Sequence, residues 1–204
     1  MNALDGQAWD ERYRGSELVW GAGPNRFLVE QVTDLTPGTA VDVACGEGRN
    51  AIWLAEQGWR VVGVDFSQVG LEKARRLAAE RGVTVEWQQG DLTTWVTPNT
   101  FDLVIAMYLH LPADIRHLVF ARMAASVAPG GTMLVVGHDV LNLAEGYGGP
   151  QNPEILYGPA EVVGDLDGVL EIERAERVHR PLSTPDGEAT AIDVLVRGRR
   201  RDEP

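Results

Sequence analysis

Short apolar runs and amphipathic stretches alternate along most of this chain. The runs are rich in Val, Ile and Leu, and the stretches place apolar residues three or four positions apart. The first pattern predicts buried β-strands and the second predicts amphipathic helices. We expect strands at 39–43, 59–64, 83–88, 101–106 and 132–136, alternating with helices at 49–57, 68–81 and 114–128. This order predicts right-handed βαβ units around a mainly parallel sheet.

The last third of the chain has a different pattern. A loop rich in Gly, Pro and Asn covers 142–153, and a short helix is expected at 159–166. Two strand-like segments, 170–180 and 189–197, flank a turn that contains Pro-Asp-Gly, which predicts an antiparallel hairpin. We therefore predict an α/β protein with a Rossmann-like, doubly wound, mainly parallel seven-stranded sheet that ends in an antiparallel hairpin.

Composition and charge narrow the class of protein. A chain of 204 residues is expected to form one domain. Its net charge of -12 repels phosphate backbones, so we expect no nucleic-acid partner. One cysteine excludes an internal disulfide framework, and no apolar run approaches the ~20 residues of a membrane span. With no signal-peptide pattern at its start, the protein is expected to be cytoplasmic, without a membrane partner, and a monomer or homodimer.

A glycine-rich turn follows the first predicted strand. Residues 41–50 read VDVACGEGRN, which places Gly46 and Gly48 between the end of a strand and the start of a helix. Open α/β sheets bind ligands at this edge, and glycine lets the backbone come close to them. Asp65 ends the next strand, 23 positions after Asp42 (65 minus 42), a spacing suited to an acid that binds ribose hydroxyls. Together these signals predict a nucleoside-type ligand.

The turn also fits a dinucleotide site. Residues 46–51 match G-x-G-x-x-A, so an NAD-dependent oxidoreductase is one alternative. Asp42 and Glu47 argue against it, because two carboxylates at the turn would repel a pyrophosphate and suit a cationic ligand.

These motifs are similar to those of the class I S-adenosylmethionine-dependent methyltransferases, over about 20–137. The resemblance implies S-adenosylmethionine as cofactor and S-adenosylhomocysteine as product, with the turn around the methionine part and Asp65 on the ribose. Ala44 stands where the family often has glycine, a small departure if its φ is negative. The cofactor-binding residues that the resemblance implies are Trp20, Asp42, Ala44, Cys45, Gly46, Gly48, Asn50, Asp65, Phe66, Ser67, Asp91, Leu92, Ala106, Met107 and Tyr108.

Part of this chain resembles one type of enzyme within the family, the tellurite-resistance and thiopurine type. The residues that carry this resemblance are 45–50, the Trp20-Gly21 pair and 58–65. Enzymes of that type methylate small molecules with soft nucleophilic atoms. The resemblance therefore implies methyl transfer to a small-molecule acceptor, with sulfur, selenium or tellurium as a candidate atom. A protein that binds S-adenosylmethionine without turnover is the remaining alternative.

Loops after the fourth and fifth strands of the parallel sheet supply the candidate catalytic residues. Tyr108 and His110 follow 101–106, and His138 and Asp139 follow 132–136. His110 is the best single candidate for a base or an orienting group, with a structural histidine as the alternative. His138 and Asp139 together could orient a nucleophile. No metal is predicted.

Two amphipathic helices, at 6–14 and 25–35, precede the first strand. In related enzymes this segment covers the cofactor and the substrate as a lid. We expect Trp9 and Tyr13 to form an aromatic substrate-binding wall, and Arg26 to meet an anionic group of the substrate or the cofactor carboxylate. Ordinary packing is the alternative for the two aromatic residues. The single domain, 1–204, is thus expected to comprise a lid segment (1–36), a cofactor-binding core (37–137), and a substrate loop with the hairpin (138–204).

Overall fold

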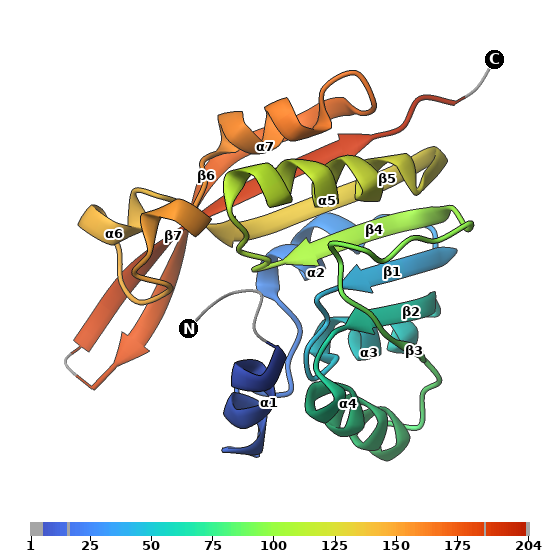
Figure 1. Cartoon of the computed structure of the whole chain (residues 1–204), viewed down its shortest axis with the longest axis horizontal. Coiled ribbons are helices and arrows are strands. Elements are labelled where there is room, and N and C mark those ends of the chain that lie inside the picture. The colour runs from blue at the N-terminus through green and yellow to red at the C-terminus, as the bar shows by residue number, and fades with distance from the viewer. Residues whose placement is uncertain (1–5, 16, 186, 203–204) are drawn as a thin grey trace.

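A seven-stranded sheet forms the centre of the protein, seen in a computed structural model that describes residues 6–15, 17–185 and 187–202 (Figure 1). The strands are β1 (Thr39–Val43), β2 (Arg60–Asp65), β3 (Glu86–Gln89), β4 (Phe101–Met107), β5 (Val127–His138), β6 (Glu171–Thr184) and β7 (Gly187–Arg199). Their order is β3-β2-β1-β4-β5-β7-β6. All pairs among β1 to β5 are parallel, and β7 is antiparallel to both of its neighbours. The predicted fold class is confirmed.

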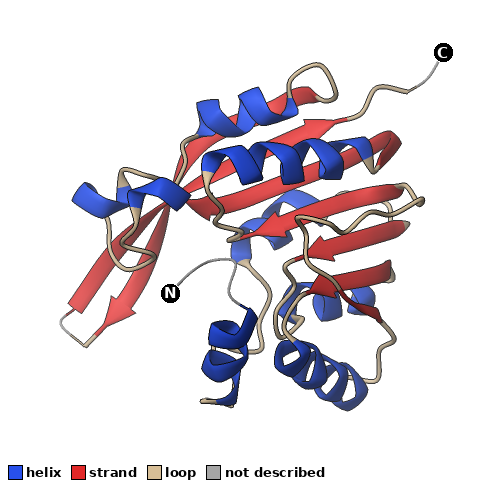
Figure 2. Cartoon of the chain, viewed as in Figure 1, coloured by secondary structure: helices blue, strands red, loops and turns tan. Residues whose placement is uncertain are grey.

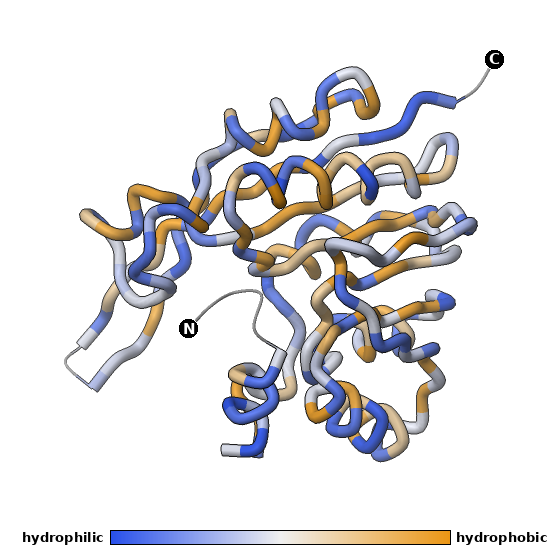
Figure 3. The backbone as a smooth tube through the Cα atoms, viewed as in Figure 1, coloured by the Kyte–Doolittle hydropathy of each residue, from blue (hydrophilic) through white to orange (hydrophobic). Residues whose placement is uncertain are grey.

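Helices cover both faces of this sheet (Figure 2). They are α1 (Gly6–Arg14), α2 (Arg26–Val32), α3 (Arg49–Glu56), α4 (Gln68–Glu80), α5 (Ala113–Ala125), α6 (Asn142–Glu145) and α7 (Pro159–Leu166), with a short 3-10 helix at Pro153–Ile155. Side chains of α5 and α7 belong to one apolar core, and those of α2 and α3 to a second. Figure 3 shows hydrophobic residues along the central strands and hydrophilic ones on the segment that follows β7. Each helix in the described ranges is too short or too polar to cross a bilayer.

The strand order reverses beside β1, and this reversal positions the site. β1 lies between β2 and β4, with Val43 level with Val64 on one side and with Ala106 on the other. The loops that follow these three strands therefore leave the sheet side by side. In open α/β sheets such a switch point is where ligands bind.

Several predicted boundaries are wrong, including that of the strand expected at 83–88, which is Glu86–Gln89. The helix expected at 114–128 ends at Ala125, and the strand expected at 132–136 begins at Val127, ahead of Pro129. Tertiary pairing accounts for the difference, because Phe101 is level with Val127 and the Phe101 N–H donates to the Ser126 carbonyl. Both strands of the hairpin are also longer than predicted.

Candidate functional site

A cavity of about 1060 Å³ opens at the carboxyl ends of β1, β2 and β4. Its wall combines the turn after β1, the N-terminal segment, the end of β4, the loop at 147–152 and the β6 strand. Pockets for one drug-sized ligand measure about 300–1,000 Å³. This cavity therefore has room for a nucleoside cofactor and a second small molecule.

Most of the predicted site residues line this cavity. Those on its wall are Trp9, Tyr13, Trp20, Arg26, Ala44, Cys45, Gly46, Asn50, Asp65, Phe66, Met107, Tyr108, His110 and His138. Those that are not on its wall are Asp42, Gly48, Ser67, Asp91, Leu92, Ala106 and Asp139. The second group does not contribute to the wall of this cavity.

The turn after β1 takes a left-handed backbone at three positions. Ala44 has a φ of 55°, Gly46 of 53° and Gly48 of 77°. The condition under which alanine would cost little at position 44, a negative φ, is therefore not met, and a non-glycine residue there costs about 1–2 kcal/mol. Such strain is found where the surrounding structure holds a functional segment in place. Gly46 is required by space as well, because a Cβ atom there would lie 2.5 Å from the Tyr13 hydroxyl.

Asp65 presents a carboxylate at the end of β2. Its two oxygens accept hydrogen bonds from the backbone N–H groups of Gly46 and Ser67, each at 2.8 Å. Burial raises the pKa of Asp65, and these hydrogen bonds oppose that effect. A carboxylate has about four lone-pair sites, so both oxygens keep acceptor capacity toward the cavity. This is the geometry that an acid needs to bind two ribose hydroxyls.

Asp42 and Glu47 do not act as the predicted acidic pair. Asp42 is fully buried behind the turn, where one oxygen accepts from the Ala51 N–H at 3.1 Å. Its other oxygen has no hydrogen-bond partner among the described residues, and burial raises the pKa of Asp42 to about 8. Glu47 lines the cavity but is paired with Lys73 at 3.0 Å, with both side chains buried. The carboxylate argument against a dinucleotide thus loses its basis.

The N-terminal segment lies against the turn through several contacts. Glu47 also accepts from the Val19 N–H at 2.9 Å, and Lys73 donates to the Tyr13 carbonyl. The Asn25 N–H donates to Asn50 at 2.9 Å, so helix α2 begins beside α3. These buried contacts hold the segment over the ligand-binding edge.

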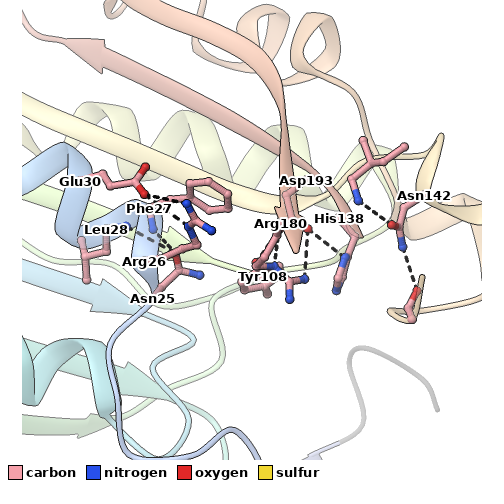
Figure 4. A network of polar contacts seen from close by, with 12 residues as sticks. Asn25, Arg26, Phe27, Leu28, Glu30, Tyr108, His138, Asn142, Arg180 and Asp193 are labelled. Atoms are coloured by element: carbon pink, nitrogen blue, oxygen red, sulfur yellow. Dashed lines mark hydrogen bonds and ion pairs between the residues drawn. The ribbon is translucent and has the colours of Figure 1, made fainter. Parts of the chain in front are cut away.

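A buried carboxylate on β7 organises the opposite side of the cavity (Figure 4). Asp193 accepts from the Tyr108 hydroxyl at 2.8 Å and from the Arg180 Nε at 2.7 Å, and it lies 3.1 Å from the His138 Nδ1. Burial by itself raises the pKa of Asp193, but the adjacent His138 ring and the Arg180 guanidinium outweigh it and hold that pKa below its usual range. Asp193 therefore stays ionised and fixes three cavity-lining side chains.

Tyr108 has a backbone as unusual as that of Ala44. Its φ is 60°, and its N–H donates to the Val136 carbonyl. Burial and the charge of Asp193 raise the pKa of the Tyr108 hydroxyl, so it keeps its proton and donates it to that carboxylate. Tyr108 therefore lines the cavity in a fixed orientation and does not serve as a base.

The two histidines differ in what they can do. His110 Nε2 accepts a hydrogen bond from the His138 backbone N–H at 3.0 Å. Burial, and to a smaller extent the nearby His138 ring, lower the pKa of His110 to about 3. Its basic nitrogen is therefore occupied, which leaves His110 an orienting role. His138 uses Nδ1 toward Asp193, and Figure 4 shows its second ring nitrogen directed away from that carboxylate. A carboxylate that orients an imidazole in this way leaves the far nitrogen available to accept a proton.

The expected partnership of His138 with Asp139 is replaced by one with Asp193. Asp139 is fully buried, accepts from the Leu141 N–H at 2.8 Å, and forms an ion pair with Arg177 at 2.8 Å. The register of the hairpin places Asp193 level with His138. The signal that could have revealed it is a single acid within the apolar run 191–196.

Sequence reasoning also missed several wall residues. They are Arg12, Asn25, Arg49, Arg180 and Leu182. The loop at 147–152 lines the cavity. Within the described ranges, no group of three His, Cys, Asp or Glu side chains could hold a metal ion.

Comparisons with known proteins show similarity to methyltransferases. A family model described as a methyltransferase domain matches residues 40–131. The trans-aconitate 2-methyltransferase of Sinorhizobium medicae (strain WSM419) is 34% identical over 124 residues, which are 58% of this chain and 46% of that relative. The chain spans about half the length of the curated relatives that it matches.

Solved structures show the same fold over almost the whole chain. A structure described as "Conversion of a Disulfide Bond into a Thioacetal Group during Echinomycin Biosynthesis" has a TM-score of 0.76 at 21% identity, covering 98% of this chain and 93% of that one. N-methyltransferase NodS from Bradyrhizobium japonicum WM9, solved with S-adenosyl-L-homocysteine, has a TM-score of 0.70 at 19% identity, covering 98% and 99%. At these identities the likeness concerns the fold.

Proposed function

We propose that the chain is a class I S-adenosylmethionine-dependent methyltransferase, as the methyltransferase-domain match over residues 40–131 supports, and that it transfers a methyl group to a small molecule bound in its cavity. One observation carries this proposal: the Asp65 carboxylate lines the cavity beside the turn 44–48 and is oriented there by two backbone N–H groups. A dinucleotide enzyme is disfavoured by β7, because an antiparallel strand beside β5 does not fit a plain dinucleotide-binding sheet.

The residues present fit the cofactor. Asp65 would accept the ribose hydroxyls, Phe66 would contact the adenine, and the turn 44–48 would surround the methionine part. S-adenosylmethionine supplies a methyl group on a sulfonium centre and leaves as S-adenosylhomocysteine. The N-terminal segment, 1–36, would act as the lid that excludes water from the reacting atoms.

His138 supplies the proton-accepting group in this proposal. Asp193 orients its ring, and the ring lines the cavity. A neutral imidazole accepts a proton more easily from a thiol, with an ordinary pKa of about 8.5, than from a phenol at about 10. This match supports a soft sulfur, selenium or tellurium nucleophile as the acceptor atom. The sulfur chemistry named for one structural relative points the same way.

The remaining parts of the proposal concern partners and place in the cell. The net charge of -12 supports a small-molecule acceptor over a nucleic acid. One cysteine in the chain fits a reducing compartment, and we propose a cytoplasmic protein that works as a monomer or homodimer.

Cofactor binding and turnover are tested separately. In thermal melts, S-adenosylhomocysteine at 100 times its dissociation constant should add about 2.7 kcal/mol, which raises Tm by about 5–10 °C, whereas NAD should have no effect. Consumption of S-adenosylmethionine is then followed with sulfur, oxygen, nitrogen and halide acceptors. A shift with NAD alone would refute the family's cofactor. Binding of the nucleoside without turnover of any acceptor would identify a binding protein.

A further inference from the structure

The cavity wall has the opposite charge to the rest of the protein. The chain carries a net charge of -12, yet the described residues that line the cavity include four arginines and two acids. The arginines are Arg12, Arg26, Arg49 and Arg180, and the acids are Glu47 and Asp65. Glu47 is paired with the buried Lys73, and Arg26 is paired with the exposed Glu30 at 3.2 Å. The wall is therefore a local site for anions in a protein that repels them elsewhere.

These arginines divide between two sides of the cavity. We call the part of the wall formed by the N-terminal segment and the turn after β1 the cofactor side, and the part formed by β6 the acceptor side. Three of the arginines lie on the cofactor side: Arg12 and Arg26 on the N-terminal segment, and Arg49 as the first residue of α3. Arg180 comes from β6, together with Leu182, and its guanidinium lies 5.6 Å from the centre of the Tyr108 ring. It is thus the arginine of the acceptor side.

Arg180 is held in place by the carboxylate that also holds His138. Its Nε donates to one oxygen of Asp193 at 2.7 Å, and a terminal nitrogen lies 3.5 Å from the other oxygen. His138 Nδ1 lies 3.1 Å from that second oxygen. A guanidinium has five N–H donors, so Arg180 keeps donors for a ligand, and one carboxylate places them next to His138.

Positive charge remains after this pairing. Arg49 also lines the cavity and donates a hydrogen bond to the Trp20 carbonyl at 3.0 Å. In the described part of the chain no carboxylate lies within ion-pair distance of Arg49. The charges of Arg49, Arg180 and Asp193 sum to one positive charge, whereas Asp65 is the acid of the cofactor side. A carboxylate bound at Arg180 would balance that positive charge.

We propose that the acceptor is a compact organic acid whose carboxylate binds Arg180, which places its nucleophilic atom at His138. The planar guanidinium matches a carboxylate through paired hydrogen bonds. Because Asp193 holds both Arg180 and His138, the acid and the nucleophilic atom must be a few bonds apart. This inference rests on the proposed function and specifies its substrate class.

The test compares acids with their neutral amides. Thioglycolate, 3-mercaptopropionate and 2-mercaptobenzoate are paired with thioglycolamide, 3-mercaptopropionamide and 2-mercaptobenzamide. Methyl transfer is measured with S-adenosylmethionine, and binding is measured by calorimetry on protein saturated with S-adenosylhomocysteine, so that the cofactor carboxylate is already in place. We expect at least one acid to be bound and methylated with a kcat/KM at least tenfold above that of its amide.

Arg180→Gln should raise KM for the acids by about 10- to 100-fold, a larger rise than for the amides, so that the preference for each acid over its amide is lost. The KM of Arg180→Lys for the acids should lie between that of the wild type and that of Arg180→Gln. Arg174→Gln is the matched control, since Arg174 is exposed on the same strand and its ion pair with Glu176 contributes little.

Three results would overturn the proposal. The first is a wild-type protein that methylates acids and amides with equal kcat/KM. The second is a protein saturated with S-adenosylhomocysteine that binds none of the acids. The third is an Arg180→Gln variant whose activity falls equally with acids and amides. A wild-type protein that binds no S-adenosylhomocysteine would instead refute the proposed function.

Discussion

Replacement of Asp65 by Ala is the sharpest test of the cofactor site. The variant removes a carboxylate whose two oxygens are aimed by the N–H groups of Gly46 and Ser67, each at 2.8 Å. Two charge-assisted hydrogen bonds to a ribose would be lost, which weakens binding by about 2–3 kcal/mol. That free energy corresponds to about 30- to 150-fold in the dissociation constant for S-adenosylhomocysteine.

The assay is isothermal calorimetry with S-adenosylhomocysteine, on protein whose folding is checked by circular dichroism. Asp65→Asn separates the charge from the shape, because an amide keeps one acceptor oxygen and should lose less affinity than Ala. Asp114→Asn is the matched control, since Asp114 is an exposed acid in the first turn of α5. A folded Asp65→Ala variant that binds the ligand within threefold of wild type would refute the ribose assignment.

Four further predictions concern the turn, the lid and the base. Ala44→Gly should raise the free energy of unfolding by about 0.5–1 kcal/mol in urea titrations, since glycine relieves the φ of 55°. Because the pKa of Asp42 is raised, the folded protein retains a proton that the unfolded chain has lost between about pH 4 and about pH 8. The free energy of unfolding should therefore fall as the pH rises through this range, and Asp42→Asn should lack this contribution to the pH dependence. Glu47→Gln should lower the free energy of unfolding by about 1–3 kcal/mol through the lost pair with Lys73, and should speed amide hydrogen exchange at 9–20. His138→Asn should lower kcat with thiol acceptors by about 10²–10⁴-fold and leave S-adenosylhomocysteine affinity unchanged in calorimetry.

Each of these four has an outcome that contradicts it. A less stable Ala44→Gly variant would mean that the alanine methyl group contributes more packing than its backbone costs. The same pH slope in wild type and Asp42→Asn would remove Asp42 as its source. Unchanged hydrogen exchange in Glu47→Gln would show that other contacts hold the segment, and wild-type turnover in His138→Asn would exclude His138 as the base.

Local patterns in the sequence were enough for the sheet and for one side of the site. Each parallel strand is an apolar run beside an amphipathic stretch, and this information lies within a few neighbouring residues. The turn at 44–48 and Asp65 were predictable for the same reason, since both directly follow strands whose order places them at one edge. The start of β5 was missed because its pairing with Phe101 is a tertiary contact.

The other side of the site was decided only by tertiary structure. Asp193 is 55 positions from His138 (193 minus 138), and the two meet because the hairpin register aligns them. Lys73 neutralises Glu47 from 26 positions away (73 minus 47), which removed the basis of the electrostatic argument made from the turn alone. Charges buried in a low-dielectric interior take their properties from whichever partners the fold places near them. The sequence by itself therefore determined the architecture and the cofactor edge, whereas the protonation, the pairing and the acceptor side depended on contacts between distant segments.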